Sequence, residues 1–110
     1  MEFIDEVLIL STADSEELAS KIGTALVEEH LAACVNIVPG IRSVYRWQGK
    51  ICNDAECLML IKSSASIFER VRLRIREMHT YQVPEIIALS LETGDADYLA
   101  WLRGQLKVPD

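Results

Sequence analysis

The chain has 110 residues, half of them hydrophobic and a quarter charged, with a formal net charge of -6 at pH 7. This length fits a single domain over residues 1–110, and the composition is that of a globular chain, not a disordered one. The negative charge argues against nucleic acid as a partner, and no apolar run approaches the roughly 18 residues that cross a membrane.

The apolar pattern predicts strands and helices in the order βαββαβα. The strands are expected over residues 3–12, 33–47, 50–63 and 86–91, and the helices over residues 16–30, 67–79 and 96–106. Asp14 or Ser15 is expected to cap the first helix, and Ser66 the second. Pro39-Gly40 marks a bulge or bend, and Gln48-Gly49 turns a long hairpin. This order is typical of an α+β ferredoxin-like sandwich with an added C-terminal helix.

The predicted strand over residues 50–63 carries apolar side chains on both of its faces. Leu58 and Leu60 point to one side, and Met59 and Ile61 to the other. A strand of this kind is covered on both faces. Two helices can cover only one face of a four-stranded sheet, so the other face needs another copy of the chain. We therefore expect an oligomer, and any functional site is expected between subunits.

Several segments resemble the CutA family, the divalent-cation tolerance proteins. They are LAACVNIVPGIRSVYRWQGK, ECLMLIKS, HTYQVPEIIALSLETG and DYLAWL, and the resemblance extends over residues 7–102. It implies a ferredoxin-like subunit in a tight homotrimer, similar in assembly to PII-type signalling proteins. It also implies an association with tolerance of copper and other divalent cations. Animal relatives are linked instead to acetylcholinesterase anchoring, so the fold alone does not decide the function.

The resemblance also implies candidate metal ligands. In copper-binding members, the proposed ligands are a cysteine and two adjacent histidines, and their positions here hold Ser11, Met78 and His79. His79 keeps its ligand type, although a purely hydrogen-bonding histidine is the alternative. Met78 can offer a thioether to Cu(I) or simply pack in the core. Cys34 is a further candidate, because we expect its strand to start at the end of the molecule where the second helix finishes.

A second candidate site is a cleft between subunits. The resemblance implies that five residues gather there, namely Trp47, Glu56, Lys62, Tyr81 and Glu85. One interpretation is an ion-paired interface, because buried charges need partners. The other is a cleft for a small anion or metabolite, with Lys62 as the positive anchor.

We therefore expect a cytoplasmic homotrimer that binds copper weakly and exchangeably. The start of the chain has no signal-peptide pattern, and three cysteines without CxxC spacing suit a reducing compartment. An enzyme is not expected, because the sequence offers no catalytic triad or phosphate-binding loop. The alternative is a PII-like signalling trimer that binds a small anionic metabolite.

Overall fold

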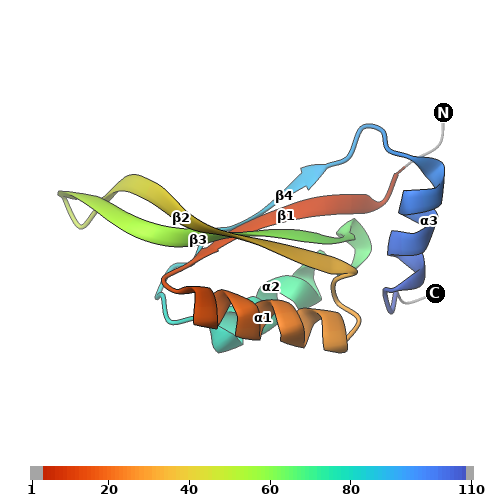
Figure 1. Cartoon of the computed structure of the whole chain (residues 1–110), viewed down its shortest axis with the longest axis horizontal. Helices are drawn as coiled ribbons and strands as arrows, with labels where there is room; N and C mark the ends of the chain where they lie inside the picture. The colour runs from red at the N-terminus through yellow and green to blue at the C-terminus, as the bar shows by residue number, and fades with distance from the viewer. Residues whose placement is uncertain (1–3, 109–110) are drawn as a thin grey trace.

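A computed structural model describes residues 4–108 of the chain. The elements are β1 (Glu6–Ala13), α1 (Glu16–Glu28), β2 (Cys34–Trp47), β3 (Lys50–Ser64), the 3-10 turn η1 (Ala65–Ile67), α2 (Phe68–Met78), β4 (Ile86–Ser90) and α3 (Ala96–Gly104). The strands form one antiparallel sheet in the order β2-β3-β1-β4 (Figure 1). The predicted α+β ferredoxin-like plan is confirmed, and Phe3 of the predicted first strand lies outside the described residues.

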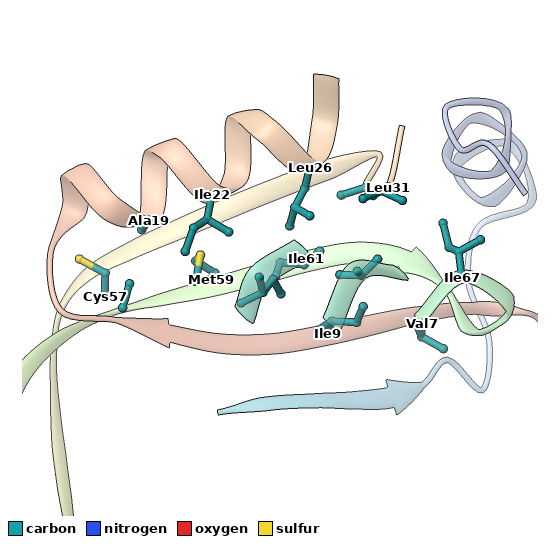
Figure 2. Close-up of a cluster of buried hydrophobic side chains, with 14 residues drawn as sticks. Val7, Ile9, Ala19, Ile22, Leu26, Leu31, Cys57, Met59, Ile61 and Ile67 are labelled. Carbon is teal, nitrogen blue, oxygen red and sulfur yellow. The ribbon is translucent and has the colours of Figure 1, made fainter. Parts of the chain in front are cut away.

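Helices α1 and α2 lie on one face of the sheet, and the hydrophobic core is between them and the strands (Figures 1 and 2). Odd-numbered residues of β1 and β3, such as Ile9, Met59 and Ile61, are fully buried there. Ile22 of α1 and Ile75 of α2 belong to the same core cluster and have no exposed surface. Helical spacing of the apolar residues thus supplies one wall of the core, and strand alternation supplies the other.

The first helix starts as expected, but the second does not. Ser15 caps α1, and its side chain accepts a hydrogen bond from the backbone N–H of Leu18. The prediction that Ser66 caps α2 is wrong, because Ser66 lies within η1 and the N-cap residue of α2 is Ile67. The carboxylate of Asp5 explains the difference, because the Ser66 hydroxyl donates to it at 2.7 Å.

The β2–β3 hairpin extends well beyond the helices (Figure 1). Its register shifts between Val38 and Ile41, which confirms the bulge predicted at Pro39-Gly40. Gln48 and Gly49 both have positive φ angles, of 49° and 77°. A two-residue hairpin turn needs such angles, because its twist must match the twist of the two strands. The projecting part forms a long arm attached to the compact domain.

The face of the sheet opposite α1 and α2 is apolar, and we call it the open apolar face. The strand register places even-numbered residues of β1 and β3 on this face together with alternate residues of β2 and β4. Its apolar members are Leu8, Leu10, Val38, Leu58, Leu60, Ile87 and Leu89. The last two are each 49% exposed in the single chain. These seven apolar side chains are therefore half-buried or exposed in the single chain, and neither helix covers them.

Helix α3 stands at the end of the sheet where β1 begins (Figure 1). Arg103 donates from Nε to Glu6 Oε1 at 2.7 Å, and Glu6 is completely buried beneath this contact. The helix therefore closes one end of the sheet but leaves most of the open apolar face accessible.

Candidate functional site

A cavity of about 680 Å³ lies between the β2–β3 hairpin and the loop that joins α2 to β4. Its volume is within the range of small-molecule sites. The hairpin contributes residues 43–45, Trp47 and Glu56, and the loop contributes residues that follow His79. Prominent lining residues are Tyr45, Trp47, Glu56, Tyr81, Val83 and Glu85. Four of the five residues predicted for the cleft are therefore together in a single chain.

Glu56 is the most enclosed charged group of the cavity, because only 8% of its surface is exposed. The Tyr81 hydroxyl donates to Glu56 Oε2 at 2.5 Å. Burial, followed by this hydrogen bond, raises the pKa of the Tyr81 phenol above its ordinary value. Among residues 4–108, no Lys, Arg or His side chain forms an ion pair with Glu56. Within residues 4–108, the carboxylate thus has a neutral hydrogen-bond donor but no counter-charge.

A second phenol–carboxylate pair lies beside the first. The Tyr45 hydroxyl donates to Asp54 Oδ2 at 2.5 Å, and this bond raises the pKa of Tyr45 to about 12. Asp54 is opposite Ser43 in the strand register, and Ser43 also lines the cavity. The hairpin side of the cavity is therefore both aromatic and acidic.

Lys62, the fifth residue predicted for the cleft, does not line this cavity in the single chain. It is on the same strand face as Glu56 but six residues further along β3, or roughly 20 Å away at strand spacing. Its ammonium group donates to Asn36 Oδ1 and lies 3.8 Å from Cys34 Sγ. A contact between Lys62 and Glu56 therefore requires a second copy of the chain.

His79 is held by hydrogen bonds at both ring nitrogens. Nδ1 accepts from the backbone N–H of Tyr81 at 3.0 Å, so Nε2 carries the proton and donates to the carbonyl of Thr12 at 2.7 Å. The ring also lies 4.6 Å from the ring of Tyr81, between centroids. In this conformation the imidazole joins the loop to the end of β1 and offers no free lone pair to a metal.

The other predicted metal ligands do not surround His79. Met78 packs against the hydrophobic core. Ser11 is fully buried, and its hydroxyl has no hydrogen-bond partner among residues 4–108. The expectation that Cys34 is near His79 is wrong: Cys34 is level with Leu8, whereas His79 bonds Thr12, four residues or roughly 13 Å further along β1.

The reason is the direction of the strands. Both β1 and β2 are antiparallel to β3, so β2 starts where β1 starts, while α2 ends near the end of β1. Within the part of the chain that the structure describes, no three His, Cys, Asp or Glu side chains are placed to hold a metal ion together.

Comparison with known proteins assigns the family. The protein-family model for the CutA1 divalent ion tolerance protein matches residues 7–105 of the chain. The chain belongs to this CutA1 family. The divalent-cation tolerance protein CutA of Thermus thermophilus is 51% identical over 98 residues, which are 89% of this chain and 95% of that protein. Human Protein CutA is 46% identical over 84% of this chain, which spans 51% of the human protein. The crystal structure of CutA1 from Oryza sativa superimposes with a TM-score of 0.92 at 38% identity, covering 96% of each chain.

Within this CutA1 fold, the sequence prediction of the site omitted Tyr45. Its position had a usable signal, because Tyr45 and Trp47 are two residues apart on one strand and therefore share a face with Glu56. Val83 follows from no pattern, since a loop residue is placed by the path of the loop. The helices of residues 4–108 include none that is long and apolar enough to span a membrane.

Proposed function

We propose that this CutA1 family member is a cytoplasmic homotrimer that binds divalent cations, copper foremost, weakly and exchangeably. The observation that carries the proposal is the open apolar face, which α1 and α2 leave uncovered. The name of the family, divalent ion tolerance protein, supports the cation and favours a binding protein over an enzyme. Three free cysteines support a reducing compartment.

The trimer follows from what the open apolar face needs. Contiguous apolar patches of this kind are uncommon on monomeric proteins, because their burial is favourable by roughly 25 cal/mol per Å². The arm formed by β2 and β3 carries two further apolar side chains on its other side, Val44 and Ile51, which are 66% and 63% exposed. A ring of three subunits buries each open face and lets each arm reach a neighbour. The total buried area should be roughly 2,000 Å² or more.

Copper is proposed to bind through His79. Its Nδ1 must first give up the hydrogen bond from the Tyr81 N–H, which costs about 1 kcal/mol. Because no ready cluster of ligands surrounds the ring among residues 4–108, affinity should be modest and metal should exchange freely. Cys34, which is distant in the same chain, should matter only for Cu(I), the softer ion.

Calorimetric titration with Cu²⁺ tests this assignment. His79→Ala should reduce affinity at least tenfold, and the matched control His30→Ala should not, because His30 contacts the backbone carbonyl of Gln105 at the other end of the molecule. Binding should weaken on acidification, because protonation removes the imidazole lone pair. Cys34→Ser should weaken Cu(I), titrated under reducing conditions, more than Cu(II), titrated under oxidising conditions. Equal Cu²⁺ affinity in the His79 and His30 variants would contradict the copper role.

A second candidate function is supported by the cavity of about 680 Å³. It is a PII-like signalling trimer in which this cavity, completed by a neighbouring subunit, holds a small molecule. Metal binding would then be incidental. The size of the cavity and its single nearly buried charge favour a small ligand over a purely structural interface.

A further inference from the structure

We propose that the cavity between the β2–β3 hairpin and the α2–β4 loop binds a small organic cation, an ammonium or guanidinium compound. This inference rests on the second candidate function, the small-ligand trimer, and names its class of ligand. It differs from the anionic metabolite that the sequence suggested, because Lys62, the residue expected to attract an anion, does not line the part of the cavity that its own chain forms.

The charges of the lining favour a cation. Glu56 and Glu85 both line the cavity, and no Lys, Arg or His of residues 4–108 does. Glu56 is nearly buried and accepts a hydrogen bond only from the neutral phenol of Tyr81 within that part of the chain. A carboxylate in such a position is stabilised strongly by a positive partner and destabilised by a negative one. Phosphates and nucleotides are therefore disfavoured here.

The walls of the cavity decide between an organic cation and a metal ion. Tyr45, Trp47 and Tyr81 all line it. Aromatic faces attract a weakly hydrated cation such as an alkylammonium, by roughly 0.5–2 kcal/mol each. A firmly held divalent metal ion takes several oxygen, nitrogen or sulfur ligands from the protein, and the cavity lining within residues 4–108 supplies two carboxylates but no imidazole or thiol. The cavity thus has the composition of an aromatic cage with an acidic floor.

Choline and 3,3-dimethylbutan-1-ol form a matched pair of probes for this inference. The two molecules have nearly the same shape, but a neutral carbon replaces the charged nitrogen in the second. Trp47 and Trp101 are the two tryptophans of the chain, so the variant Trp101→Phe leaves Trp47 as the reporter. Its fluorescence and a calorimetric titration should both detect choline, with at least tenfold weaker binding of the neutral analogue.

Two variants connect the binding to the cavity. Glu56→Gln should reduce choline affinity about tenfold and leave the neutral analogue unchanged, whereas Glu92→Gln, an exposed carboxylate outside the cavity, should change neither. Trp47→Leu, on the exposed arm and made with Trp101 retained, should weaken choline in the calorimeter even if Glu56→Gln fails to fold. The proposal would be overturned by equal binding of the two probes or by no choline binding. It would also be overturned if inorganic phosphate, and not choline, changed the fluorescence of Trp47. Light scattering on the same samples distinguishes this outcome from failure of the trimer proposal, because the samples would then contain monomers.

Discussion

Replacement of Leu60 by lysine is the most informative test of the open apolar face. Leu60 is at the centre of that face, opposite Leu10 of β1 and Asn36 of β2. In a free monomer the new ammonium would reach water, and the cost should stay within about 0.5 kcal/mol. In a trimer it would be enclosed without a partner. Even about 2 kcal/mol for each subunit makes about 6 kcal/mol for the trimer, or about four orders of magnitude in the association constant.

Sedimentation velocity over a range of protein concentrations measures this effect directly. The matched control is Leu73→Lys, because Leu73 is 48% exposed on the surface of α2, away from the sheet. Leu60→Lys should shift the population to monomer or unfolded chain at concentrations where Leu73→Lys remains assembled. The reasoning is refuted if the two variants assemble alike, since the open apolar face would then face solvent.

Two further predictions concern local structure. Gly40→Ala should lower the free energy of unfolding in denaturant by about 1 kcal/mol, because Gly40 has a positive φ of 73° at the bulge. The control Gly104→Ala should be within about 0.5 kcal/mol of the parent, because Gly104 has no positive φ and has open space around it. Equal losses of stability would contradict the bulge geometry. The hydroxyls of Ser64 and Ser66 lower the pKa of Asp5 below its usual 3.8. Its stabilising contribution is therefore complete above about pH 4 and is lost as pH falls through the lowered pKa, so Asp5→Asn should flatten the acid limb of thermal melts followed by circular dichroism. An unchanged acid limb would argue against that hydroxyl cluster.

The sequence predicted the fold well where a pattern repeats along one strand or helix. Alternation in β3 correctly separated the core side, with Met59, from the open side, with Leu58. It failed for Cys34 and His79, because their distance depends on the direction of strands joined through β3. The placement of Lys62 in a cleft between subunits stays a prediction, since residue parity fixes its face of β3 and a contact with Glu56 needs a second copy of the chain.

Local competition explains the remaining error at the start of α2. Ser66 has the right residue type for a helix cap, but its hydroxyl finds the carboxylate of Asp5, which is 61 residues earlier in the chain. A pairing over that separation has no signature in a short sequence window. The candidate cavity is similar, because the hairpin and the α2–β4 loop meet only through the folding of the whole sheet.

A native mass spectrum at micromolar concentration tests the central claim most directly. The subunit has a mass of 12.4 kDa. Protein purified without added metal or chelator should be detected as a particle of three subunits. When copper is then added, the trimer should carry it in less than stoichiometric amount. A folded monomer as the main species would contradict the account, because the open apolar face would then remain exposed to water.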